Sequence, residues 1–138
     1  MPTVTTNIYR RNVNAGLINL SANSFAVALL NGFATSGSSD IMKQVTNYSE
    51  ISAFEVSGTG YSALPLSAST LSANSSQVVF WDGNDIIWNN VTINTYGLAI
   101  YRLSVGLVVG FIDFGEQKIA VNGSITIQWN VNGIANII

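Results

Sequence analysis

The sequence predicts a single all-β domain, an antiparallel β-sandwich or jelly roll, from three observations. Short apolar runs are separated by Gly, Ser, Asn and Thr roughly every eight to twelve residues, a spacing typical of sandwiches and barrels. From residue 77 onward, nearly every segment is rich in the β-branched and aromatic residues that favour strands. The 138 residues contain no visible repeat and no long linker, so one domain accounts for the chain.

The first forty residues divide into an arm, two strands and a loop. Residues 1–16 are expected to form an N-terminal arm, extended or with a short helix, ahead of a β-sandwich domain at residues 17–138. Strands are predicted at 17–20 and 24–30, where apolar residues gather. The stretch 31–40 is rich in Gly and Ser and is expected to be a loop.

One short helical segment is predicted near residues 41–54. Ile41, Val45 and Tyr48 recur with the period of an α-helix and would form one apolar stripe. The polar residues at 49–50 also allow this segment to break into two single turns.

Strands then follow one another to the end of the chain. They are predicted at 61–66, 67–72, 77–81, 86–88, 91–93, 97–103, 107–114, 116–121, 124–131 and, as a docked last strand, within 133–138. Pro65 indicates an edge or bulged strand, because proline cannot donate a ladder hydrogen bond. Turns are expected at Asp82–Asp85, with Gly83 available for positive φ, at Ser104–Gly106, and at Asn122–Gly123, the strongest hairpin signal in the chain.

Charge is unusually scarce in this sequence. Asp, Glu, Lys and Arg make up only 9% of the residues, against about 25% in a typical globular chain. The formal net charge is −2, and 48% of the residues are hydrophobic. Such a surface is poorly protected from association, so we expect the chain to work in an assembly and to form a homo-oligomer, a dimer or trimer. A monomer with a neutral Asn/Ser/Thr surface is the alternative.

The same composition argues against several classes of function. The chain has no His and no Cys, which excludes a His-containing triad, an imidazole base and a Cys/His zinc site. Five basic residues cannot form the patch that nucleic acid requires. Asn and Ser interrupt the apolar stretch at 15–30, which argues against a signal peptide or a membrane span. We therefore expect no enzyme, no cofactor, no metal, and neither nucleic acid nor membrane as partner.

The polar turn Asp82–Asp85 is the main candidate for chemistry. Clustered oxygen ligands would suit calcium, and a carboxylate here paired with Asp113 or Glu116 would suit glycoside hydrolysis. Neither site has its full signature in this sequence. The favoured interpretation is a turn whose side chains bond their own backbone.

Three tryptophans, Trp81, Trp88 and Trp129, would suit either a sugar-stacking platform or a core. Aromatic residues in a β run more often fill a core or an interface, because each buries a large apolar area. Partner contacts are expected at aromatic and charged residues of the arm, the first loop and this cluster, namely Tyr9, Arg10, Arg11, Phe33, Trp81, Asp82, Asp85 and Trp88.

Much of the chain resembles a family of small virion structural proteins of tailed bacteriophages. The matching residues are Glu55 with Gly58, Gly60 and Tyr61; Asp85 with Trp88; Gly97 with Ile100 and Tyr101; Ile112–Gly115; and Asn122–Gly123. Residues 21–32 (SANSFAVALLNG) resemble the family's first long strand, with Ala26 where a lysine is usual.

The resemblance implies a non-enzymatic capsid decoration (cement) protein. Such a protein is made in the cytoplasm of the bacterial host, binds the major capsid protein on the outside of the virion, and stabilises the junctions between coat subunits. The alternative is a tail or tail-fibre component that binds host glycan through Trp81, Trp88 or the Asn-rich loops.

Overall fold

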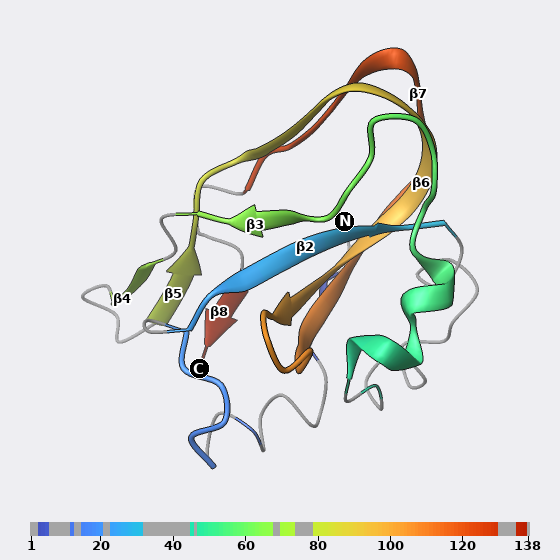
Figure 1. Cartoon of the computed structure of the whole chain (residues 1–138). Helices are drawn as coiled ribbons and strands as arrows, with labels where there is room; N and C mark the ends of the chain where they lie inside the picture. Colours follow the sequence, from blue (N-terminus) through green and yellow to red (C-terminus); the bar gives the residue numbers. More distant parts are fainter. Residues whose placement is uncertain are drawn as a thin grey trace.

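The computed structural model describes residues 3–5, 12, 15–20, 23–31, 45, 47–67, 70–73, 79–129 and 135–137. Across these residues the chain is all-β with antiparallel pairing, which confirms the predicted fold class at that level. The elements, in chain order, are β1 (Thr3–Thr5), β2 (Phe25–Leu30), the 3₁₀ turns η1 (Tyr48–Glu50) and η2 (Ser52–Phe54), β3 (Leu64–Leu66), β4 (Thr70–Ala73), β5 (Val79–Asp82), β6 (Ile86–Arg102), β7 (Val108–Ile127) and β8 (Ala135–Ile137) (Figure 1).

The described strands form two sheets. The larger sheet has the strand order β1-β7-β6-β2-β3, and the smaller has the order β4-β5-β8. Strand β2 runs antiparallel to β6, from the pair Phe25↔Arg102 to the pair Leu30↔Gly97. Strand β3 lies at the edge of the larger sheet, where the missing N–H of Pro65 is tolerated. The edge position predicted from this proline is confirmed.

The long ribbon of β6 and β7 is the main feature of the fold. Its two strands are joined at Ser104–Gly106, where Ser104 and Gly106 have positive φ, so the connection predicted there is confirmed. Between the pairs Thr95↔Lys118 and Gly97↔Asp113, β7 advances by five residues while β6 advances by only two. Extra residues on one strand bend a ribbon, and Figure 1 shows β6 and β7 arching over the larger sheet beyond this point.

Apolar clusters lie on both faces of the larger sheet. All six residues of β2 are buried, and they serve both faces because successive side chains point to opposite sides. Phe25 belongs to the larger cluster, which also includes Trp81 of β5. Leu30 belongs to the smaller cluster, with Phe111 of β7 and Ile51 between the two 3₁₀ turns.

The inner face of the arching part of the ribbon closes over the larger cluster. We call residues 86–95 of β6 and 118–127 of β7 the distal ribbon. Its buried apolar members are Ile86, Trp88, Val91, Ile93, Ala120, Ile125 and Ile127. The alternation predicted for 124–131 is confirmed as far as Ile127, because Ser124 and Thr126 are exposed. One ribbon therefore supplies strands to the sheet and a cover for its core.

The segment after η2 lies tightly against β6. A Cβ atom on Gly58 would stand 2.2 Å from the carbonyl oxygen of Thr92. Gly60 has a φ of +78°, and its Cβ would stand 2.5 Å from the carbonyl oxygen of Asn90. The amide of Thr92 donates to the carbonyl of Thr59 at 3.1 Å. Both glycines of this segment are required for the close approach of two backbones.

The helical segment predicted near 41–54 forms two single 3₁₀ turns over the described residues 47–54, the second of the two outcomes considered. Asn47 begins η1 by accepting the amide of Ser49, while the carboxylate of Glu50 accepts the amide of Asn47 at 2.7 Å. The side chain of Asn47 also donates to the carbonyl of Val105 at 3.0 Å. The capping box satisfies the first amides of η1, and the bond to Val105 holds the turn against the β6–β7 connection.

Three predictions of local structure are wrong. Residues 17–20 form no strand, since the amides of Leu17 and Ile18 both donate to the carbonyl of Asn12 in a turn. Asn122 has the expected positive φ of 46°, yet β7 continues through it, and the residue forms a bulge opposite β6. The break predicted at 89–90 is likewise a bulge, where Asn90 has a φ of 54°.

The predicted arm contributes a strand to the sheet, and the predicted turn before β6 has a different geometry from that expected. Within residues 1–16, Thr3–Thr5 pairs with Gly110–Ile112 of β7. Gly83 lies in the connection between β5 and β6, but its φ is not positive. A Cβ atom at this position would stand 2.8 Å from Cδ1 of Leu66. Glycine is therefore favoured because a side chain would clash, and not because the backbone needs a positive φ.

Replacing Gly58 by alanine should destabilise the fold by about 1–3 kcal/mol, because the new methyl group overlaps the Thr92 carbonyl and one backbone must move. Gly123→Ala is the matched control, since its Cβ would meet the carbonyl oxygen of Val121 at an ordinary 3.7 Å. That variant should change stability by less than about 0.5 kcal/mol. Urea unfolding followed by tryptophan fluorescence measures both, and equal losses would contradict the close approach.

Candidate functional site

The polar turn between β5 and β6 fastens the end of β7. The carboxylate of Asp85 accepts the amide of Trp129 at 2.9 Å, and the indole N–H of Trp129 donates to the carbonyl of Asn84 at 2.9 Å. Asp82 accepts the amide of Gly83 at 2.8 Å. The Asp82 contact fits the expected turn whose side chains bond their own backbone, whereas Asp85 bonds a distant segment instead. Within the described residues, no group of three or more acidic side chains could hold a metal ion.

Two of the three tryptophans lie in the core. Trp81 is 0% exposed and meets Phe25 edge to face, with ring centroids 5.0 Å apart. Trp88 is 2% exposed, and its indole N–H donates to the carbonyl of Ser62 at 2.7 Å. The core interpretation is confirmed for this pair. This burial argues against their assignment as partner contacts and as a glycan platform, because neither ring offers a face to a ligand.

Of the other predicted contact residues, only Asp82 and Asp85 lie among the described residues. Asp82 is half-buried and Asp85 is exposed, and both lie in the turn described above. Tyr9, Arg10, Arg11 and Phe33 lie outside the described residues. No shared contact surface therefore emerges from the predicted set within the part of the chain that the structure describes.

The acids considered for glycoside hydrolysis do not form a described pair. Glu116 is exposed on β7, and its carboxylate lies 2.6 Å from the ammonium of Lys118. The hydrogen bond and the charge of Lys118 lower the pKa of Glu116. The side chain of Asp113 lies outside the described set.

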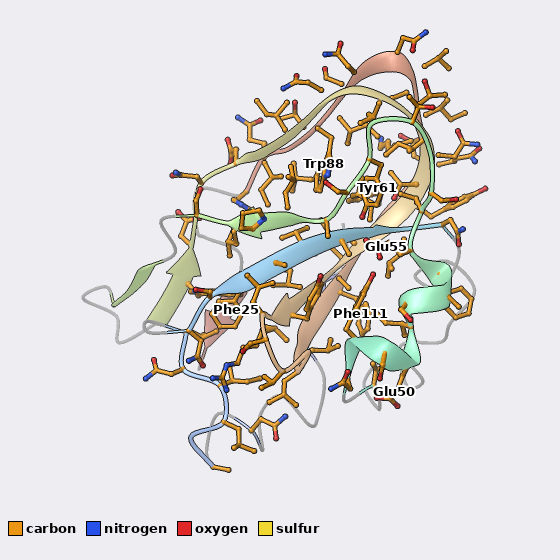
Figure 2. The ribbon with its side chains drawn as sticks, in the orientation of Figure 1. Phe25, Glu50, Glu55, Tyr61, Trp88 and Phe111 are labelled. Atoms are coloured by element: carbon orange, nitrogen blue, oxygen red, sulfur yellow. The ribbon has the colours of Figure 1, made fainter. Side chains whose placement is uncertain are left out.

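Glu55 and Tyr61 form a clamp on β2. The hydroxyl of Tyr61 donates to the carboxylate of Glu55 at 2.9 Å and accepts the backbone amide of Leu29 at 2.9 Å. The ring of Tyr61 stacks on Trp88, with centroids 6.2 Å apart, and Figure 2 shows Tyr61 between Trp88 and Glu55. One phenol thus joins the larger sheet, the loop after η2 and the distal ribbon.

Two further tyrosines lie beside this clamp. Tyr48 and Tyr101 stack with centroids 4.3 Å apart and planes 13° from parallel. The hydroxyl of Tyr48 is buried without a hydrogen-bond partner of good geometry. Burial raises the pKa of Tyr48, Tyr61 and Tyr101, and the negative charge of Glu55 adds to this effect. These phenols stay protonated near neutral pH, so the cluster is suited to holding chain segments together and poorly suited to proton transfer.

The outer face of the distal ribbon is a surface that the sequence analysis did not single out. We call it the ribbon face, and its exposed members are Ile87, Asn89, Asn90, Thr92 and Asn94 of β6 and Ile119, Val121, Asn122, Ser124 and Thr126 of β7. None of them is charged; the exposed Lys118 of the distal ribbon lies opposite the buried Thr95 and is not among them. Ile87, Ile119 and Val121 are 50%, 62% and 71% exposed, so three large aliphatic side chains stand on this face.

A signal for this face exists in the sequence. The runs 86–94 and 119–128 contain no Asp, Glu, Lys or Arg, and their apolar residues do not alternate strictly. The two bulges shift which residues point outward, and bulges are set by pairing between strands. The face could therefore be assigned only once the register of β6 and β7 was known.

Comparison with known protein families, with curated proteins and with solved structures finds no match to this chain. Among the described residues, no helix is long and apolar enough to cross a membrane.

Tyr61→Phe should lower the free energy of unfolding by about 1–3 kcal/mol, because the buried amide of Leu29 loses its acceptor and Glu55 loses its donor. Tyr48→Phe is the matched control. It removes a buried hydroxyl that lies near the carboxylate of Glu55 but does not meet it with hydrogen-bond geometry, so its stability should stay within about 0.5 kcal/mol of the parent. Denaturant unfolding measures both, and indistinguishable variants would contradict the clamp.

Stability should fall as the pH rises above about 10. Below the ordinary tyrosine pKa near 10, the phenols are neutral in both the folded and the unfolded chain, so they add no pH dependence. Above it, the unfolded chain loses these protons while the folded chain retains them, which favours unfolding. Urea unfolding across this range should show the decline, and Tyr101→Phe should make it shallower. A flat profile would contradict the raised pKa values.

Proposed function

We propose that this chain is a non-enzymatic virion structural protein, a capsid decoration protein that binds the major capsid protein on the outside of the particle. The resemblance to small virion proteins of tailed bacteriophages supports the proposal, and the fold gives its motif a physical meaning. Glu55 and Tyr61 clamp β2, while Gly58 and Gly60 allow the intervening loop to approach β6. The shared residues are those on which such a fold depends.

We further infer that the two sheets pack as a β-sandwich, the architecture expected of such a protein. Trp81 on β5 of the smaller sheet contacts Phe25 on β2 of the larger sheet. Both are 0% exposed, and both belong to the same apolar cluster. Contact between buried aromatic residues of two sheets supports a two-layer arrangement.

The ribbon face is the observation that carries the proposal. An uncharged surface of Asn, Ser and Thr with three exposed aliphatic side chains avoids the large cost of burying an unpaired charge against a protein partner. Its amides and hydroxyls can bond to the backbone and side chains of a partner. Loss of charge and enrichment of apolar groups distinguish the centre of a protein interface from ordinary surface.

A decoration protein gains from repetition over the lattice. A specific interface buries roughly 1,200–2,000 Å² in total, and the ribbon face would supply its central part. Each bound copy would link neighbouring coat subunits, so opening a junction would require breaking contacts on both sides of it. Copies that engage more than one subunit also gain avidity. This is how a small rigid domain would raise the resistance of a capsid to heat or pressure.

Ile87→Asp should reduce rebinding to capsids at least tenfold, because a carboxylate would be buried against the partner without a counter-charge. The assay is co-sedimentation of the purified protein with source virions from which it has been stripped. Val105→Asp is the matched control, since Val105 is 46% exposed but lies at the far end of the ribbon, and it should bind like the parent.

Two outcomes would count against the proposal. Equal binding by both variants would show that the ribbon face is not the contact. Capsids that neither rebind the parent protein nor lose thermal resistance when it is removed would overturn the decoration role itself.

A further inference from the structure

Among the described residues, one edge of β7 has no partner strand along most of its length. On the side away from β6, β1 covers only Gly110–Ile112, and no other described strand pairs with β7 there. Residues 114–117 also have no partner across the ladder on the β6 side. An uncovered strand edge presents unpaired N–H and C=O groups to any strand that approaches it.

The open edge carries an unusual set of side chains. Glu116 and Lys118 form the one ion pair found within the described residues, with the carboxylate and the ammonium 2.6 Å apart. Immediately beyond them, Ile119 and Val121 are 62% and 71% exposed, the largest values for big apolar side chains in the described part of the chain. Charge and exposed apolar surface thus meet at a single strand edge.

The order of these charges makes the edge complementary to itself. A lone lysine on an edge normally opposes pairing between copies. Here Glu116 precedes Lys118 by two residues, with Gln117 between them. If two such edges run antiparallel about a two-fold axis at Gln117, Glu116 of each copy lies opposite Lys118 of the other. In the same register Ile119 lies opposite Gly115, which has no side chain to obstruct it.

We propose that residues 114–120 of β7 pair with the same residues of a second copy, in antiparallel register centred on Gln117, to form a two-fold homodimer. The inference deepens the proposed function, on which its biological setting rests, by naming the surface through which this virion protein binds itself. Residues in such an isologous contact appear twice, once from each copy. Backbone hydrogen bonds and the exposed side chain of Ile119 supply the attraction. The exposed charges set the register and the choice of partner more than the affinity.

Charge reversal tests the partner and the register together. Glu116→Lys would leave only positive charges at the junction and Lys118→Glu only negative ones, so each single variant should sediment as a monomer where the parent is a dimer. Mixing the two variants should restore dimers, because opposite charges again meet across the axis. An ion pair that acted only within one chain would not produce this recovery.

Two sets of controls accompany the reversal. The double swap Glu116→Lys with Lys118→Glu should remain dimeric, because the complementarity is preserved. Val105→Lys and Val105→Glu add charge at the far end of the ribbon and should also remain dimeric. Circular dichroism establishes that each variant is folded before sedimentation is measured.

A cross-link tests the register by an independent route. The chain contains no cysteine, so a single Gln117→Cys forms a disulfide only between copies. Residues directly opposite each other in an antiparallel pair have Cα atoms about 4.5–5.5 Å apart, within the range that a disulfide spans. Mild oxidation should therefore give a covalent dimer of this variant. Ser124→Cys, on the same strand but far from the axis, should not cross-link.

The failures of the two proposals can be told apart. A parent protein that stays monomeric at micromolar concentration, or single reversals that stay dimeric, would overturn the self-pairing of β7. If that monomer still binds capsids, the decoration role stands without the dimer, and a cross-link from Gln117→Cys to the coat protein instead of to itself would assign the edge to the coat. A dimer that never binds capsids would leave the self-pairing intact and remove the decoration role.

Discussion

The rest of the structure depends on the pairing of β6 with β7, two strands of unequal length. Because β7 carries extra residues between its pairs with Gly97 and Thr95, the ribbon must bend after leaving the larger sheet. The bend brings the inner face of the distal ribbon onto the same apolar cluster that the sheet buries. One continuous pair of strands thereby provides the centre of a sheet and the cover of its core, without a helix.

The loop from Glu55 to Tyr61 secures this arrangement from two sides. At the ends of the loop, the hydroxyl of Tyr61 donates to Glu55 and accepts the amide of Leu29, which attaches the loop to β2. In its middle, glycines allow backbone contact with the bulged part of β6. A Cβ atom at either glycine would overlap a carbonyl oxygen of β6, so the contact excludes any larger residue at these two positions. A rigid junction of this kind suits a protein whose role would be mechanical.

The few charged side chains occupy particular places in the fold. The carboxylate of Asp85 and the guanidinium of Arg102 bond to backbone atoms of distant segments, so these charges serve the fold. The ribbon face carries none, and its most exposed side chains are aliphatic. The neighbouring edge of β7 combines a single ion pair with open backbone groups. A face for a larger particle and an edge for a second copy would account for a surface that is ill-suited to a free monomer.

Local signals predicted some elements and missed others for one physical reason. The strand character of Phe25–Leu30, the edge position of Pro65 and the turn at Ser104–Gly106 depend on side-chain type and backbone freedom, so the sequence alone determined them. The pair Asn122–Gly123 also predicts a positive φ, which both a hairpin turn and a β-bulge can require. Which of the two forms depends on the strand that lies opposite. The ribbon face and the open edge of β7 follow from that pairing. The burial of the tryptophans was predictable from their size. The ribbon face, which replaces them as the candidate site, was decided by the register of β6 with β7, which is a property of the tertiary structure.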